Sequence, residues 1–154
     1  MLSIMIWGCI TLNGVGTLHM TDENIKSVHY EQIIDENLWP VILKEFPTGD
    51  CIFQQDNCSV HAAHIIRDYL QREDIRTLPW PAKSPDLNII ENLWFILKFE
   101  IKRKIDSIKN MQDLKKVISD CWAGIQRPYI KKLYESIPRR LRAVQVHKGH
   151  LTKY

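Results

Sequence analysis

The chain has 154 residues, of which 45% are hydrophobic and 25% are charged, and its formal net charge is only +3. This composition is typical of one globular domain with a substantial core, so it excludes a disordered chain. The longest apolar run, Leu2–Leu12, is interrupted by Gly8 and lacks the features of a signal peptide, which argues against a membrane-spanning or secreted protein. Four cysteines without a C-x-x-C pair indicate reduced thiols of an intracellular protein.

The first fifty residues predict a β-hairpin followed by a bent helix. Two apolar segments, Ser3–Leu12 and Val15–Met20, flank Asn13-Gly14. This dipeptide is typical of hairpin turns because both residues tolerate positive φ. Apolar residues at helical spacing then predict a helix over Ser27–Phe46, bent or restarted near Trp39-Pro40 because proline cannot continue the backbone hydrogen bonds.

The middle of the chain predicts two short strands around one helix. Cys51–Gln55 and Ile75–Leu78 have the composition of brief strands. Between them, Ser59 is a suitable N-cap for a helix over Val60–Gln71. Three prolines between residues 79 and 85 then predict a loop.

The rest of the chain predicts helices, at Leu87–Ile105, Met111–Ala123, Pro128–Glu135 and Pro138–Val144. The first has an apolar stripe with a 3.6-residue period, formed by Ile90, Leu93, Trp94, Leu97, Ile101 and Ile105. The predicted order, β-β-α-β-α-β-α-α, is that of an α/β fold.

Charge is distributed unevenly along the chain. Residues 1–97 contain 6 basic and 13 acidic residues (net −7), whereas residues 98–154 contain 15 basic and 5 acidic residues (net +10). A basic C-terminal third favours contact with a polyanion such as DNA, although a solvated lysine-rich surface is an equal alternative. The cations that we expect to bind nucleic acid are Lys102, Arg103, Lys104, Lys131, Lys132, Arg139, Arg140 and Arg142.

Two blocks resemble those around the second and third catalytic carboxylates of mariner-superfamily transposases. The first, Phe53–His61, contains Asp56, and the second, Trp80–Trp94, contains Glu91. The two carboxylates are separated by 34 residues, which is the spacing of one branch of that superfamily. One departure is Ile89, where the family usually has proline. Weaker matches, which extend the resemblance to nearly the whole chain, are Trp7-Gly8-Cys9, Gly14-Val15-Gly16 and residues 138–154.

The resemblance implies a ribonuclease-H-like fold in which three carboxylates hold two Mg²⁺ or Mn²⁺ ions. Here it assigns Asp56 and Glu91 as catalytic and metal-binding residues. One metal would activate a water or a DNA 3′-OH, and the other would stabilise the leaving oxygen. Mg²⁺ prefers hard oxygen ligands, which explains why carboxylates are needed. We therefore expect Asp56 and Glu91 to converge in the folded chain.

Structural roles are the alternatives for these residues. Asn88-x-x-Glu91 is also a capping-box pattern, in which Glu91 satisfies a backbone N–H. Asp56-Asn57 is also typical of a plain turn between a strand and a helix. Cations at residues 102–104 suit the C-terminus of a helix. We expect helix-surface positions rather than ligand roles for His61 and His64, and core positions rather than base stacking for Trp80 and Trp94.

In the family, the first catalytic aspartate lies on a strand upstream of the segment that matches Ser3–Leu12. Residues 1–105 are therefore expected to form a partial core without the first, central strand, and residues 106–154 a basic helical extension of the same domain. We expect a fragment of a cut-and-paste DNA transposase, a DNA endonuclease and strand transferase, that is inactive alone. The alternatives are a noncatalytic remnant that binds DNA or pairs with full-length transposase, and a fragment that does not fold stably. The implied partners are DNA and a second transposase subunit, without a membrane, in the nucleus.

Overall fold

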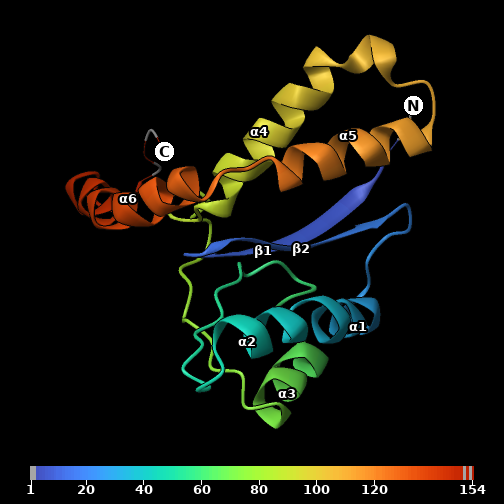
Figure 1. Ribbon diagram of the computed structural model, residues 1–154. Coiled ribbons are helices and arrows are strands. Elements are labelled where there is room, and N and C mark those ends of the chain that lie inside the picture. The colour runs from blue at the N-terminus through green and yellow to red at the C-terminus, as the bar shows by residue number, and fades with distance from the viewer. Residues whose placement is uncertain (1–2, 151, 153) are drawn as a thin grey trace.

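In the computed structural model, which describes residues 3–150, 152 and 154, a β-hairpin separates two groups of helices (Figure 1). The strands β1 (Met5–Thr11) and β2 (Gly14–Thr21) pair antiparallel, as predicted. The turn itself lies one residue earlier than expected. Leu12 and Asn13 connect the strands, and Gly14, with a φ of 147°, begins β2 in a conformation that favours glycine.

Alternation along β1 divides the apolar side chains between two cores. Trp7 and Cys9 are buried on one face, while Ile6 and Ile10 pack on the other. The first face is covered by α1 (Ser27–Asn37) and α2 (Trp39–Glu45), and α3 (His64–Arg72) packs against α1 on the side away from the hairpin. The second is covered by α4 (Ile90–Arg103), the short 3-10 turn η1 (Ile105–Ser107), α5 (Met111–Ala123) and α6 (Arg127–Val146). The hairpin is thus the middle layer of an α/β/α arrangement.

The predicted bend near Trp39-Pro40 is confirmed. Helix α1 ends at Asn37, and α2 begins at Trp39 with Pro40 in its first turn. A first-turn proline costs no hydrogen bond, because the N–H groups there have no partner within the helix. None of the helices in the described ranges is both long and apolar enough to cross a bilayer.

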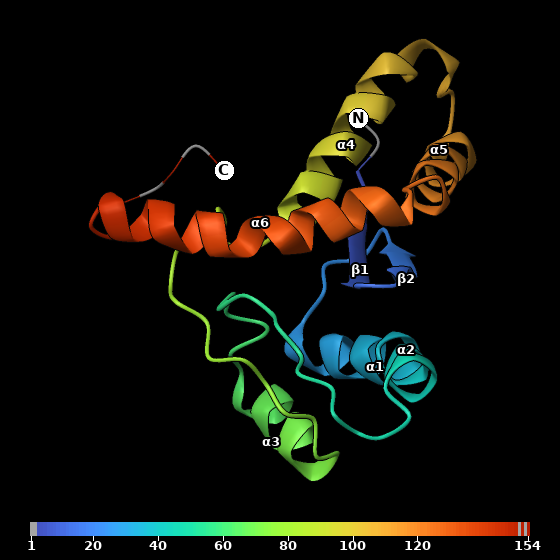
Figure 2. The ribbon, with the colours of Figure 1, turned by 60° about the vertical axis from the view of Figure 1, so that its left-hand side comes forward.

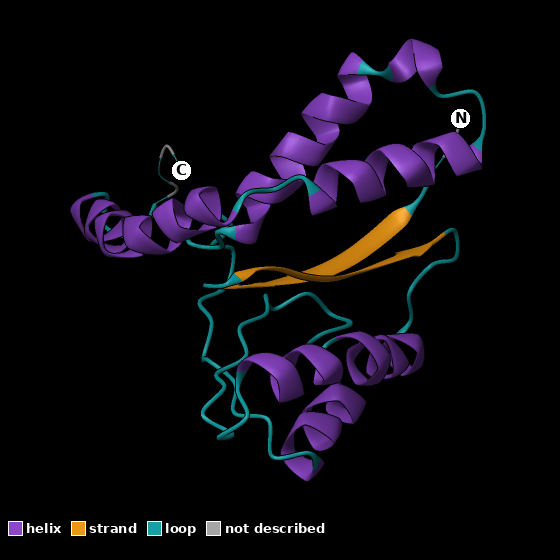
Figure 3. Ribbon diagram, in the orientation of Figure 1, coloured by secondary structure: helices purple, strands orange, loops and turns teal. Residues whose placement is uncertain are grey.

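The two predicted central strands are reduced to one parallel bridge, between Phe53 and Thr77. Phe53 N–H donates to the Arg76 carbonyl at 2.8 Å, and Leu78 N–H donates to the Phe53 carbonyl at 2.8 Å. The remainder of both segments is irregular (Figure 3). An extended segment becomes a strand only where a neighbour supplies the other half of a hydrogen-bond ladder, and this pair meets at a single position.

Two helix predictions are wrong in detail. Helix α3 begins at His64 with Ala63 as its N-cap, so Ser59 does not cap it. The two helices predicted around Pro138 form one helix, α6. Pro138 is exposed, and the buried Arg140, two residues further on, holds the helix to its neighbours through hydrogen bonds to the Asp86 carbonyl and to Asn92 Oδ1. Tertiary packing here outweighs the missing backbone hydrogen bond.

The close approach of α4 and α5 to the hairpin depends on Gly8. The rings of Trp94 and Trp122 stack with centroids 5.3 Å apart. A Cβ at Gly8 would lie 3.0 Å from the Trp122 ring and 3.1 Å from the Trp94 ring, so only glycine leaves room for both. Trp94 is therefore a core residue, as expected.

Candidate metal and catalytic site

Asp56 lies in the loop that follows the Phe53–Thr77 bridge, with its side chain exposed. Its Oδ1 accepts a hydrogen bond from the Cys58 backbone N–H at 3.0 Å and lies 2.6 Å from His61 Nδ1. The hydrogen bond from the Cys58 N–H forms a local turn, which is the structural role that we gave as the alternative to metal binding for Asp56. In the described part of the chain, Oδ2 makes no hydrogen bond, so the turn leaves a carboxylate oxygen available for a ligand.

The expectation that His61 lies on a helix surface is wrong. The residue precedes α3, and its ring lies against Asp56. Its ring stacks on Tyr30 with centroids 4.3 Å apart. The Tyr30 hydroxyl donates to Gln55 Oε1 at 2.9 Å, and Gln55 Nε2 donates to the His61 carbonyl at 3.5 Å. His61 is thus held through both its ring and its backbone. His64, in contrast, is exposed at the start of α3, as expected.

Glu91 lies in the first turn of α4. Burial of part of its carboxyl group raises the pKa of Glu91, while the Lys98 ammonium lowers it and the Asp56 carboxylate raises it. The residue as a whole remains exposed, so this burial is local. Because the charge of Asp56 influences Glu91 directly, the two carboxylates lie within electrostatic range of each other, although they come from separate blocks of the sequence.

Two hydrogen bonds hold these blocks together. Gln54 Nε2 donates to Asn88 Oδ1 at 3.4 Å, and Asn57 Nδ2 donates to the Trp80 carbonyl at 2.6 Å. The N-cap of α4 is Ile89, without a side-chain capping bond. The capping-box alternative therefore does not explain Asn88, whose side chain positions the Asp56 block instead.

A buried arginine on α6, Arg140, also holds the start of α4. The guanidinium of Arg140 donates to the Asp86 carbonyl and to Asn92 Oδ1, both at 2.8 Å, and to Ser136 Oγ at 2.8 Å. Arg140 is only 3% exposed. This corrects the expectation that it contacts DNA phosphate, because its nitrogens are already bonded to the protein. The Asp86 carboxylate accepts two further bonds from Thr152, at 2.9 and 3.1 Å.

The other predicted DNA-binding cations differ in their surroundings. Arg103 is paired with Glu100 at 2.6 Å, and Lys131 lies 3.8 Å from Glu135. Lys102 and Arg103 occupy the last turn of α4, where cations also favour the helix dipole. Among these predicted cations, those that are exposed and form no ion pair with a described residue are Lys102, Lys132, Arg139 and Arg142, while Lys104 is half-buried.

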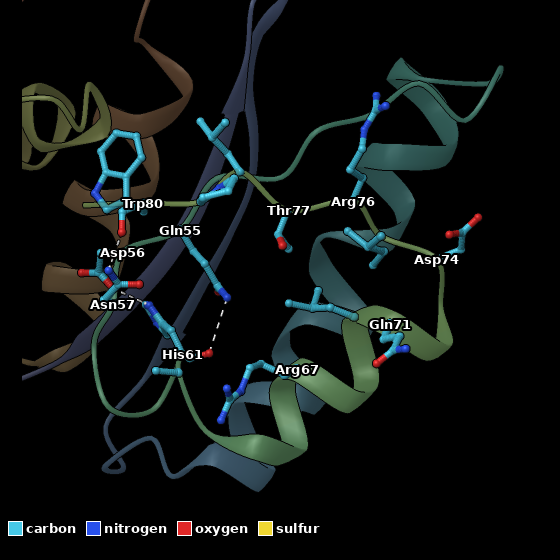
Figure 4. Close-up of a pocket in the computed structure, with 15 residues that line it drawn as sticks. Gln55, Asp56, Asn57, His61, Arg67, Gln71, Asp74, Arg76, Thr77 and Trp80 are labelled. Carbon is cyan, nitrogen blue, oxygen red and sulfur yellow. Dashed lines mark hydrogen bonds and ion pairs between the residues drawn. The ribbon is translucent and has the colours of Figure 1, made fainter. Parts of the chain in front are cut away.

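Asp56 and His61 also line an open cleft of about 740 Å³ between the Asp56 loop and α3 (Figure 4). Arg67 and Arg76 line the same cleft, so it carries positive charge as well as the Asp56 carboxylate. Sequence reasoning missed both cations, because they lie in the acidic part of the chain. The sequence did contain one indication of the position of Arg76, because this residue lies within the predicted strand Ile75–Leu78, which was expected close to the predicted strand Cys51–Gln55 that precedes Asp56.

Comparison with known proteins identifies the class to which this fold and site belong. Residues 3–115 match the DDE superfamily endonuclease family, and the chain belongs to that family. Its fold also matches the ribonuclease-H-like catalytic domain of Mos1 transposase, determined with raltegravir and Mg, with a TM-score of 0.81 and 19% identity. That match covers 97% of this chain and 77% of the other. The mixed α/β class is thus confirmed, with a two-stranded sheet among the described residues.

The relatives by sequence are transposases. The chain is 35% identical to the transposable element Tc1 transposase of Caenorhabditis elegans, covering 99% of this chain and 55% of the relative. It is 32% identical to the Tc3 transposase of the same organism, covering 99% of this chain and 46% of that relative. The chain thus spans about half the length of the curated relatives it matches.

Proposed function

We propose that this chain is part of the catalytic domain of a cut-and-paste DNA transposase, in which Asp56 and Glu91 hold Mg²⁺ or Mn²⁺. The proposal is supported by the effect of the Asp56 carboxylate on the pKa of Glu91, which it raises, since the two residues come from the two blocks that resemble the family. Both side chains are exposed, and in the described residues Asp56 Oδ2 is not used by the protein. Two accessible carboxylates suit a hard divalent cation. Membership of the DDE superfamily endonucleases and the Mos1 structures with Mg and Mn support this function.

A divalent cation held by Asp56 and Glu91 would supply Lewis-acid activation of an attacking hydroxyl and would stabilise charge on a leaving oxygen. The residues of the chain position the ligands. His61 and the Cys58 N–H orient the Asp56 carboxylate by binding Oδ1, which leaves Oδ2 without a hydrogen bond to the described residues. The Gln54–Asn88 and Arg140–Asn92 contacts hold the start of α4, which carries Glu91.

Loss of either carboxylate is expected to weaken Mn²⁺ binding. Asp56→Asn and Glu91→Gln each keep the side-chain volume but remove a charged ligand, so each should weaken the affinity at least about tenfold, the size seen when even outer-shell groups of a metal site are removed. Isothermal titration of Mn²⁺ into the whole chain measures this. Asp68→Asn, which removes an exposed carboxylate from α3, is the matched control and should bind as the parent does. An unchanged Mn²⁺ affinity in Glu91→Gln would contradict a metal site formed by both Asp56 and Glu91.

We propose DNA as the substrate, bound in part by the basic C-terminal third. The exposed cations of α6 are the strongest candidates, because phosphate binding displaces counterions only where side chains reach solvent. Pairing of two such subunits on DNA, as in the Mos1 mariner paired end complex, and a location in the nucleus belong to the same proposal.

Charge reversal on α6 is expected to weaken DNA binding equally for all sequences. In Arg139→Glu/Arg142→Glu, the slope of log affinity against log salt should fall by about 0.9 for each phosphate that the variant no longer neutralises. Fluorescence anisotropy with two unrelated duplexes over a range of salt concentrations measures this. The double reversal Lys26→Glu/Lys44→Glu changes the net charge by the same amount on α2 and the start of α1. If both double variants lose affinity equally, net charge rather than the α6 surface determines binding.

A noncatalytic DNA-binding role is the second candidate, and the exposed cations of α6 favour it. The same two experiments separate the candidates. A binding module keeps its affinity for DNA in Glu91→Gln and has no Mn²⁺ site that depends on Asp56 and Glu91.

A further inference from the structure

A second set of donor groups lies beside Asp56. The Cys58 thiol, the His61 imidazole and the Asp56 carboxylate each offer one ligand atom, and these three atoms lie within 4.8 Å of one another. Asp56 and Cys58 are exposed and His61 is half-buried, so solvent reaches the group from one side. Asp56 belongs to the site described above, but the thiol and the imidazole have no role in it as metal ligands.

The protein fixes this arrangement before any ligand arrives. The hydrogen bond from the Cys58 N–H to Asp56 Oδ1 closes the turn and brings residues 56 and 58 to the same side of the loop. Stacking on Tyr30 fixes the plane of the His61 ring, and Trp7 Nε1–H in turn donates to the Tyr30 hydroxyl at 3.4 Å. Because these contacts already order the loop, the loop would lose little further conformational entropy when a ligand binds.

The donor set differs in chemistry from that of a magnesium site. Mg²⁺ and Mn²⁺ favour oxygen ligands, whereas a thiolate together with an imidazole favours Zn²⁺ and related borderline-soft ions. Zn²⁺ binds Cys, His and Asp in tetrahedral sites, and a site with three protein ligands retains a fourth position for water. The open side of this cluster suits that fourth position.

We propose that Asp56, Cys58 and His61 form a binding site for Zn²⁺. The ion replaces the His61–Asp56 hydrogen bond with three coordinate bonds, and the thiol proton of Cys58 passes to solvent. The site and the Mg²⁺ or Mn²⁺ site share Asp56, and repulsion between two cations held by one carboxylate makes each ion weaken the binding of the other. This antagonism rests on the proposed function, whereas Zn²⁺ binding itself does not.

Co²⁺ provides a spectroscopic test, because a cobalt–thiolate bond gives a charge-transfer absorption band that an oxygen site lacks. Titration of the reduced whole chain with Co²⁺ should produce this band, and stoichiometric Zn²⁺ should remove it. Cys58→Ala should abolish the band and weaken Zn²⁺ binding by about 10- to 100-fold or more. Cys121→Ala, which removes a half-buried thiol on α5, is the matched control and should keep the band.

Two further variants separate this site from its neighbour. His61→Phe keeps a ring to stack on Tyr30 but removes the ligand nitrogen, so it should weaken Co²⁺ binding while the circular dichroism spectrum stays unchanged. Glu91→Gln should leave the thiolate band intact even though it weakens Mn²⁺ binding. A band that survives in Cys58→Ala, or no band in the folded parent chain, overturns the proposal. A band that depends on Glu91 also overturns it, because Co²⁺ would then occupy the carboxylate site.

Discussion

Replacing Trp122 by alanine is expected to lower the free energy of unfolding by about 3–5 kcal/mol. The ring is 4% exposed, stacks on Trp94 and closes over Gly8. Its Nε1–H also donates to the Gly16 carbonyl at 3.0 Å, a hydrogen bond between residues 106 positions apart. The substitution therefore removes a large side chain from the contact between α5 and the hairpin and leaves a partly buried acceptor without its partner. Urea denaturation followed by circular dichroism measures the change.

Trp122→Phe provides the comparison for this effect. Phenylalanine retains an aromatic ring against Trp94 but removes the donor to Gly16, so its effect should be clearly smaller than that of alanine. Equal, small decreases in stability for both variants would mean that α5 contributes little to the stability of the hairpin layer.

Arg140→Met should lower the free energy of unfolding by about 2–4 kcal/mol, because three hydrogen bonds from a charged donor are removed from a buried position. Methionine preserves much of the side-chain length, so the main effect is on the acceptors, namely the Asp86 carbonyl, Asn92 Oδ1 and Ser136 Oγ. Thermal and urea denaturation measure the decrease.

Arg142→Met is the matched control, since it removes the same group from an exposed position of the same helix. It should change stability by no more than about 0.5 kcal/mol. Arg140→Lys should remain destabilised, because the single nitrogen of an ammonium cannot occupy the positions of the three guanidinium nitrogens that donate to separate acceptors. Equal stability of the Arg140→Met and Arg142→Met variants contradicts a structural role for Arg140.

The sequence was most informative where local chemistry determines structure. The hairpin follows from apolar runs around Asn13-Gly14, and the bend between α1 and α2 follows from Pro40. The predicted helix Met111–Ala123 agrees with α5 at both ends. Its start carries an explicit signal, since the Asn110 side chain accepts a hydrogen bond from the Asp113 N–H at 3.0 Å.

Features that depend on distant partners could not be predicted in the same way. The irregular segments around Phe53 have strand composition, but their pairing is decided by which neighbours are present. Arg140 and Arg142 occur in the same basic run, and only tertiary packing separates the buried cation from the exposed one. Charge counting therefore identified a basic region without identifying which of its residues face solvent.

The candidate site also combines features that local sequence predicts with features that depend on distant residues. The two blocks that contain Asp56 and Glu91 are recognisable as sequence patterns, and the Asp56 carboxylate raises the pKa of Glu91 in the folded chain. The position of His61 was not recognisable, because it depends on Tyr30, a residue from α1 outside both blocks. Because the stacking partner lies 31 positions earlier, no pattern in the sequence around His61 indicates it.

Helix α6 extends from beside the hairpin past the start of α4 (Figure 2). Its Arg127 donates to Asn13 Oδ1 at 3.1 Å, its Tyr134 hydroxyl donates to the Ile10 carbonyl at 3.4 Å, and its Arg140 holds the start of α4. The first two contacts join residues 114 and 124 positions apart, so they close very long loops and form slowly. During synthesis on the ribosome, β1 and β2 emerge long before α6 does. The apolar face that they present to α4–α6 is therefore only partly covered, by α4 and α5, until α6 is made, and the contacts of Arg140 with the start of α4 form only then.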